Sequence, residues 1–389
     1  MIVVVGAGPA GIAAALAANE CGRAVTVIDE NPAPGGQIWR GDADQRWVVR
    51  FRNSGIPLLA GARVVWGDPV SRTLLLELPD GARQIEYETL VIATGSRERF
   101  LPFPGWTLPG VFGAGGLQAL AKSGLPVQGK NIIVAGTGPL LLAVAAYLRG
   151  KGANIRLIAE QTPAASLWPF GWNLAKRPAK SLQGLRLAWD LAGVPYVPAS
   201  WVVSANGEGR LQSVVLNRRG TVVTEECDYL AIGFGLQPST ELATLLVGPD
   251  TLVAATGDAE LALLEGRAAG YRAAGNVPKA AAMDPDLRRA RAFADELDKT
   301  FALRDELRHL ADADTIVCRC EDVPLGRLEG KDSFRDAKLH TRCGMGPCQG
   351  RICGPALNFL FGWPDTSQRP PILPARIGTL LAEDQGLRE

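Results

Sequence analysis

The fold is decided by residues 2–30, which read IVVVGAGPAGIAAALAANECGRAVTVIDE. Residues 2–5 are β-branched, as in a buried parallel strand, and residues 24–28 form a second apolar run of that kind. Between them lie a glycine-rich turn at residues 6–11 and an alanine-rich stretch that predicts a helix through about Cys21. This order of strand, G-x-G-x-x-G turn, helix, strand and acidic residue predicts a fold that binds an adenine dinucleotide.

Each glycine of the turn has its own task in such a fold. Gly6 permits the tight turn, Gly8 lets the backbone reach a pyrophosphate, and Gly11 lets the helix sit close to the sheet. The helix N-terminus offers unpaired N–H groups and a positive dipole end to the phosphates. The acid that ends the second strand is placed to accept the ribose hydroxyls. The cofactor-binding residues predicted here are Gly6, Gly8, Pro9, Ala10, Gly11, Asp29 and Glu30.

The composition limits the other classes of function. The 389 residues suit two or three domains, and 47% hydrophobic with 21% charged residues describes a folded chain. The net charge of +1 argues against nucleic acid or an acidic membrane as a partner, since either needs a concentrated positive field. Two histidines leave little room for histidine metal sites or a Ser-His-Asp triad. Because the sequence has neither an apolar run of about 20 residues nor a signal peptide, we expect a cytoplasmic protein without a transmembrane segment.

Two further motifs favour FAD over NAD. Pro34-Gly35-Gly36-Gln37 follows the acid directly, and Ala93-Thr94-Gly95 ends a later apolar run. With these motifs the sequence resembles the flavoproteins with two dinucleotide-binding domains, the class that includes glutathione and thioredoxin reductases. The resemblance implies that the flavin nucleotide is contacted by Gly36, Gln37, Ala93, Thr94, Gly95 and, in a late A-x-G-D motif at residues 255–258, Asp258. The stretch between Gly235 and Asp258 is shorter than in that class, which leaves open whether the site holds FAD or only ADP or ATP.

The pattern recurs at residues 131–160, where a strand, a GTGPLL turn, a helix and another strand follow one another. The repeat predicts a second Rossmann-like domain inserted into the first. Leu141 stands at the third glycine position and would hold the helix away from the sheet, which argues against NAD(P)H binding there. The expected domains are an FAD-binding domain at 1–105 and 230–311, the second Rossmann-like domain at 106–229, a cysteine module at 312–365 and a proline-rich tail at 366–389.

Five of the seven cysteines lie between residues 318 and 353, including a C-x-C pair, Cys318 and Cys320, and a C-x4-C pair, Cys348 and Cys353. In a reducing compartment such a cluster indicates metal ligation, and thiolates suit zinc or an iron–sulfur cluster. A C-x-C pair is tight for tetrahedral zinc, and an electron carrier makes chemical sense beside a flavin. A [2Fe–2S] cluster is therefore favoured, with zinc and free or disulfide-bonded thiols as alternatives. Neither nucleotide motif carries a Cys-x-x-Cys dithiol, which disfavours disulfide reductase chemistry.

The cysteine segment resembles the [2Fe–2S] module of bacterioferritin-associated ferredoxins, in the version with G-M-G-x-C-Q-G-x-x-C. The resemblance implies Cys318, Cys320, Cys348 and Cys353 as the cluster ligands, with Cys343 as a bystander or an alternative ligand. The span between the two pairs is short for that family, which suggests a trimmed helix near residues 328–334.

These motifs, together with the closing RPPILPARIG, resemble over nearly the full length the α subunit of heteromeric dye-linked amino-acid dehydrogenases. That group includes opine oxidases, D-hydroxyproline dehydrogenase, L-proline dehydrogenase and hydrogen cyanide synthase. The resemblance implies an α/β chain of two Rossmann-like domains, one inserted in the other, with a small C-terminal α-helical [2Fe–2S] module.

The same resemblance implies a division of labour between subunits. An FAD-containing β subunit oxidises the substrate, and this chain, in which we assign no catalytic residue, passes the electrons toward a quinone or dye, often with a small ferredoxin-like γ subunit. We expect the cysteine module to dock near a flavin and the proline-rich end to pack over the body. Two other functions stay open, namely an NAD(P)H-dependent flavin reductase and a structural subunit that binds only ADP or ATP.

Overall fold

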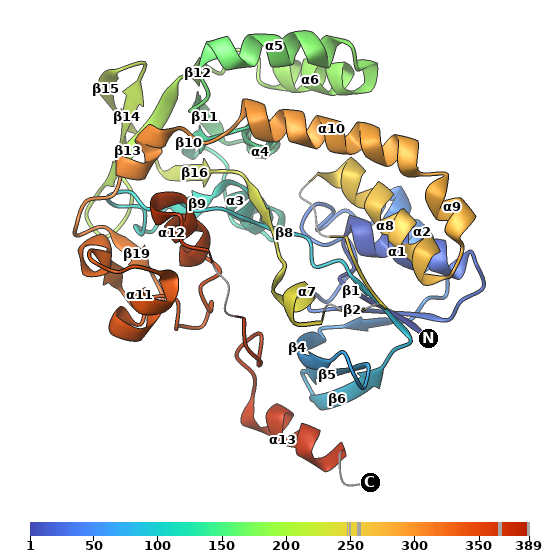
Figure 1. Cartoon of the computed structure of the whole chain (residues 1–389). Helices are drawn as coiled ribbons and strands as arrows, with labels where there is room; N and C mark the ends of the chain where they lie inside the picture. The colour runs from blue at the N-terminus through green and yellow to red at the C-terminus, as the bar shows by residue number, and fades with distance from the viewer. Residues whose placement is uncertain (247, 249, 255–257, 365–367, 387–389) are drawn as a thin grey trace. The chain divides into compact units, whose positions relative to one another are not determined.

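The computed structural model describes residues 1–246, 248, 250–254, 258–364 and 368–386. The chain forms two compact units, each built from segments that are separate in the sequence. Unit 1 contains Met1–Arg97, Leu236–Ala294 and Ser367–Glu389, and unit 2 contains Glu98–Gly235 and Asp295–Thr366. Each unit holds a five-stranded sheet of the parallel type, so the fold is mixed α/β and Rossmann-like (Figure 1).

The sheet of unit 1 has the strand order β18-β7-β1-β2-β3. Ile2 lies opposite both Val25 and Thr89, so β1 and its two neighbours end at the same edge of the sheet. All four residues of β1 are buried, as expected for a central parallel strand with both faces covered. The strands are β1 (Ile2–Val5), β2 (Val25–Asp29), β3 (Leu58–Ala60), β7 (Thr89–Ile92) and β18 (Thr251–Val253).

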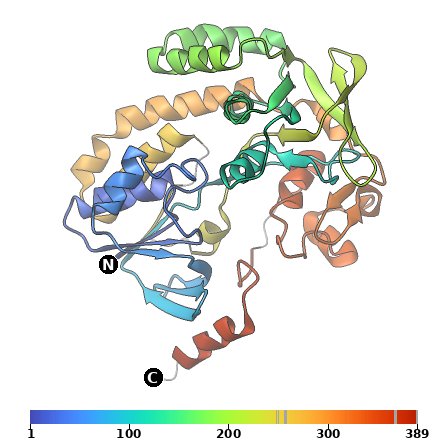
Figure 2. The same cartoon turned by 180° about the vertical axis from the view of Figure 1, so that it is seen from behind.

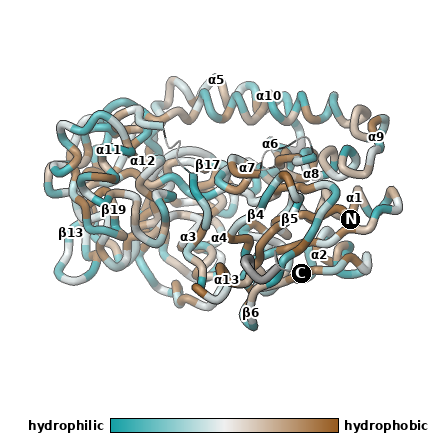
Figure 3. Tube along the Cα trace, turned by 60° about the horizontal axis from the view of Figure 1, so that its bottom comes forward, coloured by the Kyte–Doolittle hydropathy of each residue, from teal (hydrophilic) through white to brown (hydrophobic). Residues whose placement is uncertain are grey.

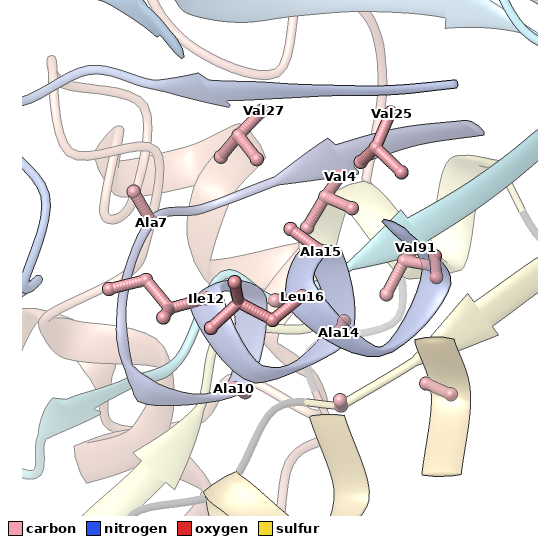
Figure 4. Packing of buried hydrophobic residues seen from close by; sticks show 14 of the residues in the cluster. Val4, Ala7, Ala10, Ile12, Ala14, Ala15, Leu16, Val25, Val27 and Val91 are labelled. Atoms are coloured by element: carbon pink, nitrogen blue, oxygen red, sulfur yellow. The ribbon is translucent and has the colours of Figure 1, made fainter. Parts of the chain in front are cut away.

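Two helices, α1 (Pro9–Asn19) and α8 (Ala259–Ala273), lie side by side in unit 1 (Figures 1 and 2). Glycines in α8 allow the close approach, because a Cβ at Gly266 would lie 2.1 Å from the carbonyl oxygen of Ala10. Figure 4 shows how alanines of α1 fill the space beneath the valines of the sheet, among them Val4 and Val27.

A three-stranded antiparallel sheet completes unit 1, with β4 (Arg63–Asp68), β5 (Thr73–Leu78) and β6 (Gly81–Glu86). Figure 3 colours much of the backbone around β4 and β5 brown, as hydrophobic. The C-terminal segment packs on this sheet: Ile372 is buried, and its N–H donates to the carbonyl of Val65 over 2.8 Å. The N–H of Arg376 donates to Glu77 just before α13 (Ile377–Gly386) begins. These contacts confirm that the proline-rich end packs over the body.

The sheet of unit 2 has the order β12-β11-β10-β16-β9, with all neighbours parallel. Its strands are β9 (Val111–Gly113), β10 (Asn131–Gly136), β11 (Asn154–Glu160), β12 (Tyr196–Pro198) and β16 (Tyr229–Gly233). The helices α3 (Ala114–Lys122) and α4 (Leu140–Gly150) pack on it through a core that contains Leu117, Val134 and Leu141. An antiparallel sheet follows, made of β13 (Ser200–Asn206), β14 (Ser213–Arg218) and β15 (Thr221–Glu226).

The cysteine-rich segment forms a small module within unit 2, with its own core of buried residues such as Phe334 and Leu357. It contains β19 (Ile316–Cys318), β20 (Val323–Pro324), the 3₁₀ helix η2 (Leu325–Leu328), α11 (Phe334–Thr341) and α12 (Cys353–Phe361). Near residues 328–334, where we expect a trimmed helix, η2 ends at Leu328 and the Ser333 side chain caps α11, which begins at Phe334, so residues 329–333 are not helical.

The unit boundaries differ from the expected domain boundaries. Residues 98–105, 230–235 and 295–311 belong to unit 2 rather than to the first nucleotide domain. The physical reason is burial: Leu101, Leu230 and Leu307 share one apolar core with residues of β10 and β11. The module also shares this core, through Ile352 and Phe359, so its packing partner within the unit is the second Rossmann-like fold.

The remaining elements are α2 (Arg46–Arg52), β8 (Ser96–Glu98), α5 (Ala164–Ala175), α6 (Pro178–Asp190), β17 (Leu236–Pro238), α7 (Glu241–Leu246), α9 (Val277–Ala281), α10 (Asp284–Thr300) and the 3₁₀ helix η1 (Asp305–His309). Among the described residues, no helix combines the length and the apolar character that a membrane crossing requires.

The contact between α1 and α8 gives a prediction on stability. Gly266→Ala should lower the free energy of unfolding of unit 1 by about 1–3 kcal/mol, because the new methyl group collides with the backbone of α1. Gly171→Ala in α5 is the matched control, since nothing lies within 4 Å of its Cβ position and alanine is the better helix former by roughly 1 kcal/mol. Denaturant unfolding of both variants measures this, and an unchanged Gly266→Ala protein would contradict the close packing.

Candidate functional site

The glycine turn after β1 is built around backbone contacts that exclude side chains. Gly6 has a φ of +105°, and a Cβ there would lie 2.2 Å from the carbonyl oxygen of Ala93. A Cβ at Gly11 would lie 1.7 Å from the carbonyl oxygen of Gly6. The N-cap of α1 is Gly8, which provides no side-chain cap, so backbone N–H groups at this helix start are left for a ligand.

Asp29 closes the turn from the neighbouring strand. Its Oδ2 accepts a hydrogen bond from the N–H of Ala7 at 2.5 Å, and its Oδ1 accepts bonds from the N–H and the side-chain amide of Asn31. The side chain is buried at the edge where β1 and β2 end. Glu30 differs, because its exposed carboxylate lies 3.7 Å from Arg63 on the surface. Of the two predicted acids, only Asp29 reaches the turn.

The other segments predicted for the first site come together at the same turn. Gly36 has a φ of +58°, and a Cβ there would lie 2.9 Å from the Cα of Gly8. Thr94 donates its hydroxyl hydrogen to the carbonyl of Ser239 over 2.7 Å. Gln37 accepts a bond from Arg40, and Gly95 has a φ of +67°. The loop at 34–37 and the carbonyl of Ala93 therefore border the glycine turn.

Asp258 is the N-cap of α8 and accepts a hydrogen bond from the N–H of Leu261 at 2.8 Å. The rest of the late motif, Ala255, Thr256 and Gly257, lies outside the described residues. The structure thus places Asp258 at the start of the helix that packs on α1, and its predicted contact with a flavin stays a prediction.

The second glycine turn is filled by the chain itself. The N–H of Gly138 donates to Glu160 over 2.8 Å, and Thr162 donates to the other oxygen of the same carboxylate. Glu160 is fully buried, and this burial raises the pKa of its carboxyl group. Leu141, at the third glycine position, is fully buried as well, with a methyl group 3.4 Å from the Cβ position of Gly233.

Residues that follow α10 cover this second turn. The Thr137 hydroxyl donates to the carbonyl of Phe301 at 3.0 Å, and the Phe301 side chain lies 3.8 Å from the Cβ position of Gly138. The buried side chain of Gln161 donates to the carbonyl of Ala302 and accepts from the N–H of Arg304. Sequence reasoning missed this cover, because residues 301–304 carry no motif that marks them as partners of a glycine turn.

The four predicted metal ligands line one cavity of about 220 Å³ within unit 2. This is far more than the roughly 10–15 Å³ that a single water-sized atom needs, so there is room for a cluster of several atoms. Cys343 does not line the cavity; it is fully buried, with its sulfur within 4.8 Å of the sulfurs of Cys318 and Cys353. The cavity is lined by Phe100, Trp106, Cys318, Arg319, Cys320, Cys348, Ile352 and Cys353.

The sulfurs of Cys318, Cys343 and Cys353 are hydrogen-bonded to one another, and this shifts their pKa values. Hydrogen bonds from Cys343 and Cys353 lower the pKa of Cys318 to about 2, and the same bonds to Cys318 raise the pKa values of the other two thiols. The N–H of Gly344 also points at the Cys318 sulfur, at 3.4 Å. Soft thiolate donors and a backbone N–H directed at sulfur fit an iron–sulfur cluster as well as zinc.

An aromatic wall closes one side of the cavity. The indole N–H of Trp106 donates to the carbonyl of Ile316 at 2.6 Å, which ties the wall to β19 of the module. Phe100 lies beside it with ring centroids 6.1 Å apart, and the Arg319 guanidinium stacks over the indole at 5.5 Å. These groups keep water away from the cysteines on that side and lower the local dielectric constant.

Comparison with known proteins agrees with this architecture. Residues 1–253 match the family model described as pyridine nucleotide-disulphide oxidoreductase, so the chain belongs to that family and is an oxidoreductase. It is 31% identical to the HcnB subunit of hydrogen cyanide synthase of Pseudomonas aeruginosa, over 90% of each chain. It is 32% identical to an opine oxidase subunit of Rhizobium meliloti, over 97% of each chain. Among solved structures it resembles L-proline dehydrogenase from P. horikoshii, with a TM-score of 0.72 and 18% identity over 97% of this chain and 78% of that one.

The cavity predicts which cysteines hold a metal. If the cavity holds the expected iron–sulfur cluster, Cys348→Ser should remove iron and acid-labile sulfide from the protein, because Cys348 lines the cavity. Cys343→Ala should keep both, because Cys343 does not line the cavity. Iron and sulfide determination on the two purified variants measures the difference. Loss of the metal from Cys343→Ala with retention in Cys348→Ser would assign the site to the buried triad instead.

Proposed function

We propose that this chain is the electron-transfer subunit of a heteromeric amino-acid or opine dehydrogenase. A flavoprotein partner subunit oxidises the C–N bond of the substrate, and this chain receives the electrons. The observation that carries the proposal is the convergence of four cysteines on one cavity, in a chain whose first unit has the turn of a dinucleotide site. Relatives named as subunits of opine oxidase and hydrogen cyanide synthase support the heteromeric setting.

The first site is proposed to hold FAD, which supplies two-electron and one-electron redox chemistry when bound. The glycine turn and the start of α1 receive the pyrophosphate. Asp29 accepts hydrogen bonds from the ribose hydroxyls and, at the same time, from the N–H of Ala7. Gly36, Gln37 and residues 93–95 border the nucleotide, with Asp258 at the start of α8. The visible absorption spectrum of the purified chain tests this, since a site that holds only ADP or ATP gives no flavin bands.

The cysteine cavity is proposed to hold a [2Fe–2S] cluster, a one-electron carrier when bound. Cys318, Cys320, Cys348 and Cys353 are its ligands, and the N–H of Gly344 stabilises negative charge on the Cys318 sulfur. The wall formed by Phe100 and Trp106 limits access of water.

The location of both histidines supports a partner as the site of substrate oxidation. His309 and His340 are exposed, and the Nδ1 of His340 lies 2.8 Å from Asp336 on the surface of α11. Neither histidine lines the cysteine cavity. Proton abstraction from an amine substrate is therefore assigned to the partner subunit rather than to this chain.

The closed second turn argues against a self-contained NAD(P)H-dependent flavin reductase. Glu160 occupies the N–H of Gly138 that a pyrophosphate would approach, and Phe301 lies over the same glycine. A dinucleotide would have to displace both the carboxylate and the segment that covers it. Electrons are therefore proposed to come from the partner subunit.

Asp29 and Glu30 form a matched pair for testing the first site. Asp29→Asn should weaken FAD binding by about 10–100-fold, because a hydrogen-bonded charged acceptor is lost. Glu30→Ala should leave it unchanged, because Glu30 faces Arg63 on the surface. Flavin titration of the two apoproteins measures both, and equal losses would show that the geometry of the turn was assigned wrongly.

The source of the electrons is tested by anaerobic stopped-flow mixing with NADH and NADPH. We expect neither nucleotide to reduce the flavin of the wild-type chain on the time scale of turnover, because Phe301 and Glu160 close the second turn. Fast bleaching of the flavin by either nucleotide would overturn the proposal in favour of a reductase.

A further inference from the structure

The helices α5 and α6 form an antiparallel hairpin in unit 2 (Figures 1 and 2). Several of its large apolar side chains are exposed. The exposed fractions of Trp168, Trp172 and Trp189 are 79%, 75% and 83%. Leu182 and Leu185 are about as exposed. We call these five residues the tryptophan face. Single exposed apolar residues are ordinary, whereas a contiguous group of this size marks an interaction surface.

The spacing of these residues places them on one side of each helix. Trp168 and Trp172 are four positions apart on α5, and Leu182, Leu185 and Trp189 follow at three- and four-residue steps on α6. The residues that turn inward are only half-buried, among them Leu167, Phe170 and Leu187. The hairpin therefore has two apolar sides, and the outer one carries the larger aromatic surface.

The hairpin is anchored, so its outer face is held in place. The Ser181 hydroxyl donates to the carbonyl of Leu174 at 2.7 Å, which joins the two helices. Arg149 donates to the carbonyls of Asp190 and Ala192 at the end of α6. At the inner side the ring of Phe170 meets Phe301 edge-on, with centroids 5.4 Å apart. Hydrophobic residues on a fixed outer face need a partner surface.

The charge around the face indicates which partner. Residues 161–189 contain Lys176, Arg177, Lys180 and Arg186 and no acidic residue. Arg177 is paired with Glu296 at 3.2 Å, and the acid that ends α6, Asp190, is exposed next to Trp189. Lys176 and Arg186 are exposed, and Arg186 is one position from Leu185 and four from Leu182. The net charge of +1, which argues against an acidic membrane as a partner, is a sum over the whole chain. It does not describe the local excess of basic residues in this segment.

We infer that the tryptophan face docks on the surface of an anionic lipid bilayer. Tryptophan and leucine on one side of a helix with mainly basic charges beside them are the signature of a helix that lies in the membrane interface. A subunit interface would also bury aromatic residues, and the excess of basic over acidic residues beside the face is what favours lipid. The inference goes beyond the proposed electron transfer and does not rest on it.

Co-sedimentation of the full chain with vesicles tests the inference. The wild-type chain should bind vesicles that contain phosphatidylglycerol and bind pure phosphatidylcholine weakly. The Lys176→Gln/Arg186→Gln variant should bind the anionic vesicles roughly 10-fold or more weakly, because each basic residue near such a surface contributes several-fold. The Trp168→Ala/Trp172→Ala/Trp189→Ala variant should lose binding to both kinds of vesicle. Val70→Ala, an exposed apolar residue far from the hairpin in sequence, is the control and should bind like the wild type.

A second measurement separates insertion from simple adsorption. Brominated acyl chains should quench part of the tryptophan fluorescence of the wild type but not of the triple variant. Wild-type protein that fails to bind anionic vesicles, or a triple variant that binds as well as the wild type, overturns the inference. Binding by the isolated chain that disappears in the assembled complex also overturns it and assigns the face to a partner subunit.

Discussion

The arrangement of the cysteine module depends on one constraint, which is that thiols from two separate segments must reach the same cavity. Cys318 and Cys320 come from the end of β19 and the turn after it, whereas Cys348 and Cys353 come from the loop before α12 and its first residue. The core around Phe334 and Leu357 fixes these segments, and Trp106 ties the module to the second Rossmann-like fold. Without that packing the four cysteine side chains would not be held around one cavity.

The two Rossmann-like folds of the chain differ in the hydrogen bonds made at their glycine turns. In the first, Asp29 at the strand end accepts the N–H of Ala7, and we propose that the N–H groups at the start of α1 receive the nucleotide. In the second, Glu160 accepts the N–H of Gly138, one position further along the turn, and the Phe301 carbonyl accepts the Thr137 hydroxyl, so the chain itself covers this turn. We therefore propose that the second fold serves as a scaffold, which packs against the cysteine module through a shared apolar core.

The first nucleotide fold could be predicted from the sequence, because the backbone contacts at Gly6 and Gly11 leave no room for a side chain. Only glycine fits at these positions, so the motif can be recognised in the sequence. The cysteine pairs could be recognised for a similar reason, because few residue types can act as soft metal ligands. What could not be predicted depends on contacts between distant segments. The unit boundaries follow from shared apolar cores, the cover at Phe301 has no motif, and the helix start at Phe334 is set by a local cap. The outward direction of Trp168 and its neighbours likewise depends on which side of α5 the rest of unit 2 covers.

The central claim is that this chain carries electrons and that a partner oxidises the substrate. The most direct measurement is freeze-quench electron paramagnetic resonance of the complex purified with its partner subunits, after mixing with the amino acids and opines that it oxidises in a dye assay. We expect a reduced [2Fe–2S] signal to appear at the rate of turnover, and we expect no such signal when this chain is mixed with the substrate alone. A cluster that stays oxidised while the complex turns over, or an isolated chain that oxidises the amine, would contradict the claim.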